Sequence, residues 1–409
     1  MTPRREAAND RPSEALSTEP ASAGSTPTDW RRIALVYCCG VVAALSLGKL
    51  ATVGPQMTAD LGLSLSQLGW AISAVVGVSA AAGLPASLFI RRLGAGRAFV
   101  AGLLMVSVAG ALTAAATGLV TLISIRVFEG VGYLLVTIAG PTLIAHLAGE
   151  RDRPTALAIW GTFVPVGIGV STMAGGLLGP QLGWRGWLGV AAVLPLLLTV
   201  LTWLWLRPNA SRTPSGAFPR PGALAGPALL STAFCVLALL TLSAMVLLPT
   251  FLADGRGQDA AGAGALTSVI SLIGVPGGLL AAMLLRRGLS PVLLAMSGAF
   301  MIPAAWLTFM DDGSAAGSVI GAGVVSLENG ILAAVVFAGL PLVVHSLDDL
   351  DVGNGLVAQL GSLGSLVGPP LFGLVAERLG WSALVWVFCA GVASGVGLLG
   401  YVLSRRRSG

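Results

Sequence analysis

Long apolar segments alternate with short polar ones along almost the whole chain, which is 409 residues long. Twelve segments reach about 20 residues, the length at which a helix crosses a hydrocarbon core of roughly 30 Å. They predict membrane-spanning helices near 33–56, 66–89, 97–117, 119–145, 154–179, 187–206, 224–252, 262–285, 291–310, 315–342, 353–376 and 382–404. The pattern therefore predicts an all-α membrane protein with 12 transmembrane helices.

Polar stretches divide these helices into domains. Residues 1–29 are rich in Pro, Ser and Thr and contain no apolar core of a signal peptide, which predicts a disordered cytoplasmic tail. A stretch that carries Pro and Arg, 207–222, separates two sets of six helices. The predicted order is a bundle over 30–206, a cytoplasmic linker, a second bundle over 223–404 and a basic tail over 405–409.

The composition supports this class and excludes others. Hydrophobic residues make up 55% of the chain and charged residues 10%, against roughly 25% charged in a soluble globular protein. These values exclude a soluble enzyme, a nucleic-acid-binding protein and a disordered chain. The 4 Cys all lie inside apolar segments, so the sequence indicates neither a disulfide framework nor a metal site. The sequence contains no GxxxxGK[ST] phosphate loop and no nucleophile, histidine and carboxylate arrangement, so we expect no enzyme activity and no cofactor.

The distribution of basic residues predicts the orientation, because Lys and Arg are enriched in cytoplasmic loops. With both termini inside, 18 of the 23 Lys and Arg residues lie on the cytoplasmic side. Only Arg185, Arg256 and Arg378 lie outside, and Lys49 and Arg126 lie within the membrane. We expect an integral, multi-pass protein of a bacterial inner (plasma) membrane with cytoplasmic N- and C-termini.

The two halves of the chain repeat at a nearly constant spacing. The pairs are Arg91-Arg92 with Arg286-Arg287 at 195 residues, Glu129 with Glu328 at 199, and the Gly-Trp pairs ending at Trp184 and Trp381 at 197. A duplicated unit with an even number of helices inserts twice in the same orientation. The repeat therefore predicts two bundles related by a pseudo-two-fold axis along the membrane normal.

Ionisable residues inside the predicted helices give the sharpest functional signal, because each costs roughly 3 kcal/mol at the bilayer centre. There are four: Lys49, Arg126, Glu129 and Glu328. We predict that Lys49, the only lysine of the chain, and Arg126 bind substrate, facing each other across the first bundle. Glu129 follows Arg126 by three residues, so it either pairs with Arg126 along one helix face or takes part in proton coupling.

Glu328 lies near the middle of its helix, and no predicted helix of the second bundle contains a basic residue. A lone carboxyl group in hydrocarbon favours its neutral form, which suits a proton-binding site. The alternative is structural, with Glu328 hydrogen-bonded to Asn329 or to the seventh or eleventh helix. Asn354 and Trp160 are further candidates for the wall of a substrate cavity, although packing between helices explains them equally well.

Several local motifs carry a family resemblance. Gln67-Leu68-Gly69-Trp70 opens the second helix, and Arg126-x2-Glu129-Gly130-x-Gly132 lies in the fourth. Patterns of small residues and proline occupy two more helices, with Gly364, Gly368, Pro369 and Gly373 in the eleventh and Gly167, Gly175 and Gly176 in the fifth. The turn after the second helix carries Arg91, Arg92, Gly94 and Arg97. Together these motifs resemble the major facilitator superfamily from about residue 30 to 404.

The resemblance implies a monomer of two six-helix bundles that rock against each other around a central substrate site. The glycines and Pro369 are then expected at helix contacts that slide or gate, with static packing as the alternative. The turn after the second helix is expected to take part in the conformational change. It departs from the family signature, because Arg91 occupies the usual Asp position and Ser87 the leading glycine.

Two functions follow from these observations. Two cations facing the cavity favour a secondary transporter of an anionic or carboxylate-bearing solute, with Glu328 as the proton carrier in symport. The alternative is a proton-driven multidrug or metabolite efflux antiporter, which the glycine and proline pattern and the apolar helices favour. In both cases the expected partners are a small-molecule substrate, protons and membrane lipid, and no nucleic acid.

Overall fold

The computed structural model describes residues 27–149, 152–206, 225–310, 313–343 and 350–405, and every regular element within these ranges is a helix. The predicted tail over 1–29, linker over 207–222 and basic tail over 405–409 lie almost entirely outside them. The first half of the chain forms α1 (Trp30–Gly48), α2 (Gly54–Leu61), α3 (Leu65–Leu93), α4 (Ala95–Ala114), α5 (Leu119–Leu147), α6 (Arg153–Trp160) and α7 (Phe163–Leu206). The second half forms α8 (Ala225–Arg256), α9 (Ala260–Arg286), α10 (Pro291–Ser297), η2 (Gly298–Phe300), α11 (Met301–Phe309), α12 (Ala315–Val343), α13 (Leu350–Leu379), η4 (Trp381–Ala383) and α14 (Leu384–Ser404).

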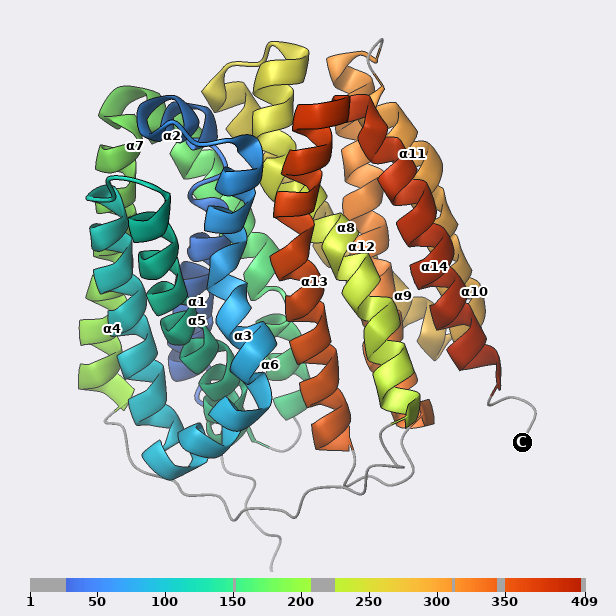
Figure 1. The fold of residues 1–409 in the computed structure, drawn as a ribbon. Coiled ribbons are helices and arrows are strands. Elements are labelled where there is room, and N and C mark those ends of the chain that lie inside the picture. Colours follow the sequence, from blue (N-terminus) through green and yellow to red (C-terminus); the bar gives the residue numbers. More distant parts are fainter. Residues whose placement is uncertain (1–26, 150–151, 207–224, 311–312, 344–349, 406–409) are drawn as a thin grey trace, which may run out of the picture.

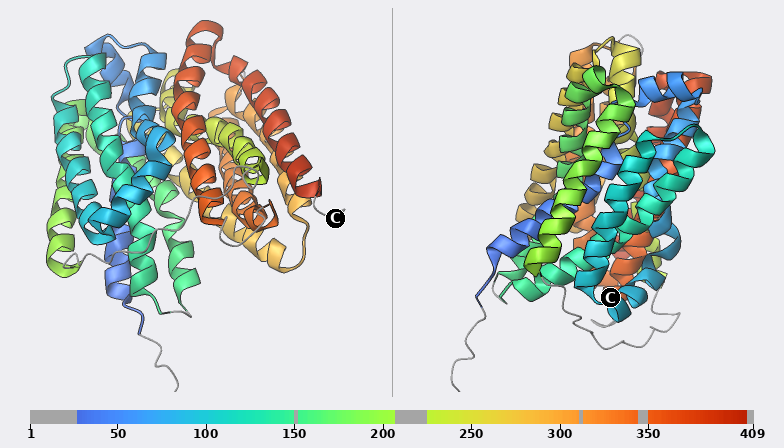
Figure 2. Two further views of the ribbon diagram at one scale, coloured as in Figure 1. Left: turned by 60° about the horizontal axis from the view of Figure 1, so that its bottom comes forward. Right: turned by 90° about the vertical axis from the view of Figure 1, so that its left-hand side faces the viewer.

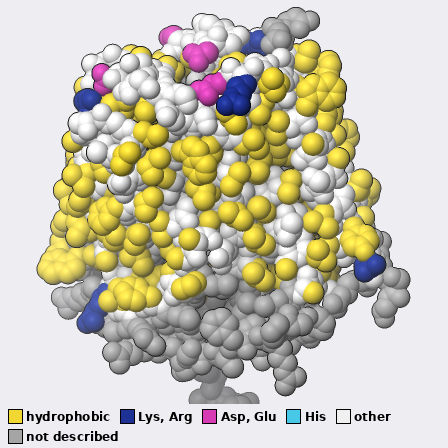
Figure 3. Space-filling view, viewed as in Figure 1, with side chains coloured by type: hydrophobic (Ala, Val, Ile, Leu, Met, Phe, Trp, Pro, Cys, Tyr) yellow, Lys and Arg dark blue, Asp and Glu magenta, His cyan; other side chains and the backbone are white. Residues whose placement is uncertain are grey.

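Eleven described stretches are long and apolar enough to cross a membrane. The longest, Phe163–Trp205, contains two crossings, because Gly183 adopts φ 67° and ψ 168° and breaks α7 at that point. Only glycine adopts such a positive φ readily. The prediction of twelve transmembrane helices is therefore confirmed. Figure 3 agrees with it, since hydrophobic side chains cover the middle of the molecule and the charged side chains in view gather near its ends.

Two of the predicted helices are interrupted. The prediction of one helix over 33–56 is wrong, because α1 ends at Gly48 and α2 begins at Gly54 with Pro55 in its first turn. A proline at this position starts a helix well, since its missing amide hydrogen would have no partner there in any case. The predicted helix over 154–179 is likewise divided between α6 and α7 by Gly161 and Thr162.

Repeat-related glycines share their backbone conformation in the two halves. Gly183 and Gly380 each precede a tryptophan, and their φ angles are 67° and 85°. Gly62 and Gly257 are 195 residues apart, and both have φ 64°. Each of these two glycines directly follows the end of one helix, α2 or α8, and begins the short link to the next, α3 or α9. The duplication seen in the sequence is therefore also present in the backbone.

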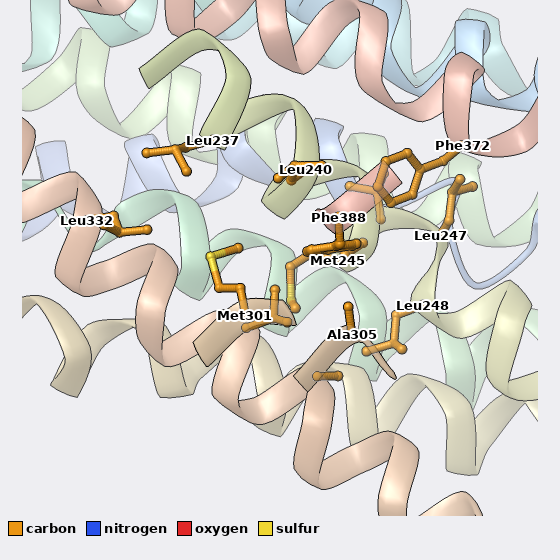
Figure 4. Packing of buried hydrophobic residues seen from close by; sticks show 14 of the residues in the cluster. Leu237, Leu240, Met245, Leu247, Leu248, Met301, Ala305, Leu332, Phe372 and Phe388 are labelled. Carbon is orange, nitrogen blue, oxygen red and sulfur yellow. The ribbon is translucent and has the colours of Figure 1, made fainter. Parts of the chain in front are cut away.

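The helices form two bundles that lie side by side, α1 to α7 in the N-terminal bundle and α8 to α14 in the C-terminal bundle (Figures 1 and 2). Two seams join them, α3 against α13 and α7 against α9. In the C-terminal bundle, buried side chains of α8, α11, α12, α13 and α14 meet in one core (Figure 4). We call the end at which α1 begins and α14 ends the terminal end and the opposite one the far end. The charge distribution predicts that the terminal end is cytoplasmic.

Candidate transport site

Three of the four intramembrane ionisable residues form one cluster inside the N-terminal bundle. Lys49 follows the last turn of α1, and Arg126 and Glu129 lie one turn apart on α5. The Lys49 Nζ lies 2.6 Å from Glu129 Oε1, and the Arg126 Nη1 lies 2.5 Å from Glu129 Oε2. Glu129 therefore binds both cations with one carboxylate, one at each oxygen.

The remaining donors of Arg126 join α5 to two other helices. Its Nε donates to the Ala71 carbonyl at 2.9 Å, and its Nη2 donates to the Ile72 carbonyl at 3.1 Å, both on α3. The same Nη2 donates to the carbonyl of Ser46 on α1, and the Ser46 hydroxyl donates to Glu129 at 2.6 Å. Because a buried charge is tolerated when it is paired and fully hydrogen-bonded, this cluster fixes α1, α3 and α5 to one another.

The cluster is closed to solvent. Arg126 and Glu129 are 0% exposed and Lys49 is 4% exposed. The Lys49 ammonium lies towards Gly110 of α4, and none of the three residues lines the cavity described below. The structure thus brings Lys49 and Arg126 together through Glu129. The expectation that the two cations face the cavity is not met in this conformation, because the carboxylate holds both inside the bundle.

Glu328 lies on α12 inside the C-terminal bundle and is 5% exposed. It is 13 residues from the start of α12, which places it about 20 Å along the helix. Its partner is the hydroxyl of Ser297 on α10, which donates to Glu328 Oε2 at 2.9 Å, rather than Asn329 or the seventh or eleventh helix. No cation among the described residues forms an ion pair with it.

A cavity of about 500 Å³ lies between the two bundles. On the side of the N-terminal bundle, the cavity is lined by the link between α6 and α7 and by the first turns of α7. On the side of the C-terminal bundle, it is lined by α8, α9, α12 and α13. The side chains are mostly apolar, and none of the described residues that line it is charged. Its hydroxyl and amide groups belong to Thr162, Thr241, Ser271, Ser326, Asn329 and Ser365. An uncharged wall of this kind suits a ligand that is itself largely apolar.

Most of these polar groups are already engaged. The hydroxyls of Thr241 and Ser365 donate back to carbonyls of their own helices, at 3.0 and 2.9 Å. Thr162 lies 2.8 Å from the Tyr37 hydroxyl. Asn329, in contrast, makes no side-chain hydrogen bond within the described ranges, and its neighbour Glu328 points away to Ser297. Its amide is the group best placed to bind a polar atom of a ligand.

Two other predicted wall residues do not reach the cavity in the described structure. Trp160 is 6% exposed and stacks on Phe163 with ring centroids 4.6 Å apart. Its ring is enclosed by Gly40 and Gly140, where any side chain would overlap it. Trp160 therefore packs inside the N-terminal bundle, although the next two residues line the cavity. The side chain of Asn354 lies outside the described part of the structure.

Four of the predicted gating glycines pack helices within one bundle. Gly364 and Gly368 of α13 lie against the backbone of α8, near Cys235 and Leu239. Gly167 of α7 faces Ala44 of α1, and Gly175 faces the Thr52 hydroxyl and the Trp187 ring. These contacts hold each bundle together, as the packing alternative predicts.

The other three positions lie in the seams between bundles. A methyl group at Gly176 would come within 2.6 Å of the Ala260 carbonyl of α9, and one at Gly373 within 2.7 Å of the Leu65 carbonyl of α3. Pro369 contacts Gly69, where a methyl group would lie 2.6 Å from its carbonyl oxygen. These are the contacts that must separate if the bundles rock at the far end.

The predicted conformational turn is a single-residue link. α3 runs to Leu93 and α4 begins at Ala95, so only Gly94, with φ 90°, lies between them. Arg97 is exposed in the first turn of α4. The backbone of Arg91 and Arg92 belongs to the last turn of α3, and their side chains are not among those described.

Some residues of the site carry no signal in the sequence. Ser46 and Ser297 bind the two buried carboxylates, but serines are common in the predicted helices and nothing distinguishes these two. Asn329 lies beside Glu328, and the sequence predicts it only as a hydrogen-bond partner of that residue. Glu377, at the far end of α13, is one of several charged residues at helix ends, and only the fold shows that it reaches α3.

Comparisons with known proteins agree with this architecture. Over 401 residues the chain is 28% identical to Monocarboxylate transporter 11 of Homo sapiens, covering 90% of this chain and 81% of that protein. It is 30% identical over 212 residues to a puromycin resistance protein of Streptomyces alboniger, covering 50% of this chain and 41% of the relative. It is also 24% identical over 153 residues to a riboflavin transporter of Clostridioides difficile, covering 37% and 34%. The last two alignments span less than half of each relative's length.

The fold has a solved counterpart. A bacterial homolog of the human lysosomal transporter Spinster, in an inward-facing and unoccupied conformation, superposes with a TM-score of 0.71 at 14% identity. The superposition covers 94% of this chain and 95% of that one. The sequence model of the Major Facilitator Superfamily matches residues 36–349. The chain therefore belongs to the Major Facilitator Superfamily and is a multi-pass membrane protein.

Proposed function

We propose that this transporter exports a small, uncharged or amphiphilic organic solute in exchange for protons, as a monomer in a bacterial inner membrane. The observation that carries the proposal is the cavity between the bundles, whose described lining holds no charged side chain. A carboxylate bound there would lose its hydrating water without gaining a counter-charge. Burying an unpaired ion in this way costs on the order of several kcal/mol. A largely apolar solute incurs no such cost.

The prediction of an anionic substrate depended on two cations that face the cavity. Lys49 and Arg126 are instead neutralised in part by Glu129 inside the N-terminal bundle. The efflux alternative therefore becomes the main proposal. The similarity to a puromycin resistance protein supports it, since that relative is named for resistance to a small organic drug.

Transport of a carboxylate is the second candidate. Two cations share one carboxylate in the buried cluster, so the cluster has a net formal charge of +1. A rearrangement that exposed Lys49 would present this charge to an anion. The similarity to a monocarboxylate transporter over most of the chain supports this candidate.

Glu328 is the proposed proton carrier. Its carboxyl group has one hydroxyl partner and no paired cation among the described residues, so it can change protonation without breaking an ion pair. Asn329, the next residue, lines the cavity and links the substrate site to this carboxyl group by one peptide unit. Exchange of substrate for proton at neighbouring positions of α12 would couple the two fluxes.

The test is proton flux in liposomes that contain purified protein and a trapped pH dye. Cationic or neutral amphiphiles and small carboxylates are added in separate arms to the wild type, Glu328→Gln and Asn329→Asp. Proton movement driven by amphiphiles and lost in Glu328→Gln supports the proposal. Asn329→Asp adds a carboxylate to the cavity and is expected to shift the preference towards cationic amphiphiles by about tenfold, the equivalent of 1.4 kcal/mol. A response to carboxylates alone would contradict the main proposal and favour the second candidate.

A further inference from the structure

A carboxylate of the C-terminal bundle completes the N-terminus of a helix in the other bundle. Glu377, near the end of α13, accepts hydrogen bonds from the backbone amides of Leu65 and Ser66, the first two residues of α3. The Ser66 amide lies 3.4 Å from Glu377 Oε1. The contact lies at the far end of the α3–α13 seam, where Glu377 is exposed to water.

These two amides have no partner inside their own helix, because the first amides of any helix lack an intrahelical acceptor. Ser64 and Gln67 form a capping box, in which the Ser64 hydroxyl accepts from the Gln67 amide at 3.1 Å and the Gln67 side chain accepts from the Ser64 amide at 2.9 Å. The box leaves the amides of Leu65 and Ser66 for Glu377. A negative charge is also favourable at a helix N-terminus, where the helix dipole is positive.

The two seams between the bundles are related by the repeat, and the contact of Glu377 occurs in one of them. The two seams use equivalent glycines: Gly69 meets Pro369 and Gly373 meets Leu65 in one, while Gly264 meets Thr172 and Gly176 meets Ala260 in the other. The spacings between equivalent glycines are 195 and 197 residues. The seams therefore match in their small-residue packing.

They do not match in the acceptor that Glu377 supplies. Counting back 197 residues from Glu377 leads to Pro180 of α7, which has no side-chain acceptor. Both helices also carry a cap from their own bundle, Ser64 for α3 and, 195 residues later, Asp259 for α9, whose Oδ1 accepts from the Gly262 amide at 2.8 Å. α3 therefore has, besides its own cap, an acceptor from the opposite bundle, and the described residues show no such acceptor for α9.

We propose that Glu377 is the latch of the far-end gate, the residue whose contact with α3 favours closure of this end and opening of the terminal end. When the bundles separate at the far end, the amides of Leu65 and Ser66 lose their acceptor, while Ser64 and Asp259 stay with the helices that they cap. The contact therefore stabilises one conformation over the other, which a cap within a bundle does not do. The proposal depends on alternating access but not on the identity of the substrate or on proton coupling.

The experiment measures how fast a cysteine buried under the far end reacts with a membrane-impermeant maleimide. Thr250 of α8 suits the label, because it is 3% exposed and its hydroxyl lies 3.4 Å from the position of a methyl group on Gly54 of α2 in the other bundle. Thr250→Cys is introduced into full-length protein whose 4 native Cys are replaced by alanine. When opening is fast compared with labelling, the rate is proportional to the population that is open at the far end.

Losing a helix cap typically costs about 1 kcal/mol, which corresponds to a change of about fivefold in a population. Glu377→Ala is therefore expected to raise the labelling rate about fivefold. Glu377→Gln keeps an acceptor and loses the charge, so an intermediate rate is expected. Asp259→Ala is the control, since it removes a helix cap at the same end of the molecule that lies within one bundle, and its rate should equal that of the parent protein.

Two results would overturn the latch. One is an unchanged labelling rate in Glu377→Ala. The other is an equal acceleration in Asp259→Ala, which would show that loss of any cap loosens the far end. The assay uses no substrate and no proton gradient, so a failed transport experiment and a failed latch experiment remain distinct. Only monodisperse protein after gel filtration is labelled, and Glu377→Gln keeps the test available if Glu377→Ala does not fold.

Discussion

The two bundles hold repeat-related carboxylates in opposite surroundings. Glu129 of the N-terminal bundle binds two cations and a serine hydroxyl, and it is 0% exposed. Glu328, 199 residues later, binds one serine hydroxyl, and the position equivalent to Arg126 is Val325. The same side chain thus joins an ion cluster in one bundle, while in the other it forms no ion pair among the described residues, as a proton carrier requires.

The difference indicates a division of labour between the bundles. A carboxylate held by two cations cannot be protonated without leaving both cations unpaired, which is strongly unfavourable in a buried site. A carboxyl group with one neutral donor carries no such penalty. We therefore expect substitutions in the N-terminal bundle to change the free energy of unfolding and those at Glu328 to change transport. The four predictions below test this contrast in order of decreasing effect on stability.

Glu129→Gln should be the most destabilising of the four. It leaves Lys49 and Arg126 buried beside each other without a counter-charge, which is expected to cost about 3–5 kcal/mol of unfolding free energy. Thermal unfolding of purified protein in detergent measures the loss. Adding Lys49→Met to Glu129→Gln removes one of the two cations and should recover part of it. If Glu129→Gln unfolds at the temperature of the wild type, the stabilising role of this ion cluster is refuted.

Lys49→Met should cost less. The substitution leaves Glu129 paired with Arg126, so one charge-assisted hydrogen bond is lost and no cation is left alone, at about 1–2 kcal/mol. The same thermal assay measures it, and transport measured in parallel addresses the second candidate function. Loss of carboxylate transport with a small loss of stability would show that Lys49 meets the substrate in another conformation.

Ser297→Ala removes the single donor to Glu328. The expected loss is about 1 kcal/mol, the usual value for one hydrogen bond in a protein. Ser394→Ala is a suitable control, because the Ser394 hydroxyl only donates back to its own helix at 2.8 Å and is exposed. Equal unfolding temperatures for the two variants would mean that the contact between Ser297 and Glu328 adds nothing to stability.

Glu328→Gln should change stability least, by less than about 0.5 kcal/mol, since glutamine still accepts a hydrogen bond from Ser297. Its effect should appear in proton-coupled flux, which is expected to disappear. Glu328→Gln should therefore keep the unfolding temperature and lose proton coupling. Glu129→Gln, in contrast, should lower the unfolding temperature. A strongly lowered unfolding temperature would instead make Glu328 a structural residue.

The sequence predicts the architecture well because its signals are local and long. Apolar segments of transmembrane length, the excess of arginine at one end and the repeated Gly-Trp pairs identify twelve helices in two bundles. The failures occur where a single residue decides a boundary. Pro55 begins a new helix within one apolar segment, and Gly161 with Thr162 interrupts another, although hydropathy is nearly continuous across both.

The site is harder to predict because it depends on how each helix is rotated about its axis. The sequence indicates that Lys49, Arg126 and Glu129 lie at similar depth. It does not indicate that all three point into the bundle, since this rotation is set by packing against α3 and α4. The same holds for the cavity, whose polar residues lie on five helices or links and share no spacing along the chain.

The contact of Glu377 with α3 has a consequence for the surroundings in which the transporter works. It is a charge against a helix dipole at the water-exposed rim, so dissolved ions screen it over a Debye length that falls from about 8 Å in physiological medium to about 3 Å at 1 M ionic strength. The buried cluster around Glu129 is shielded from those ions. The ionic strength at the far end should therefore shift the balance between the two conformations towards far-end opening while leaving each bundle intact. The resting state of the protein would then depend on the salt concentration on that side of the membrane.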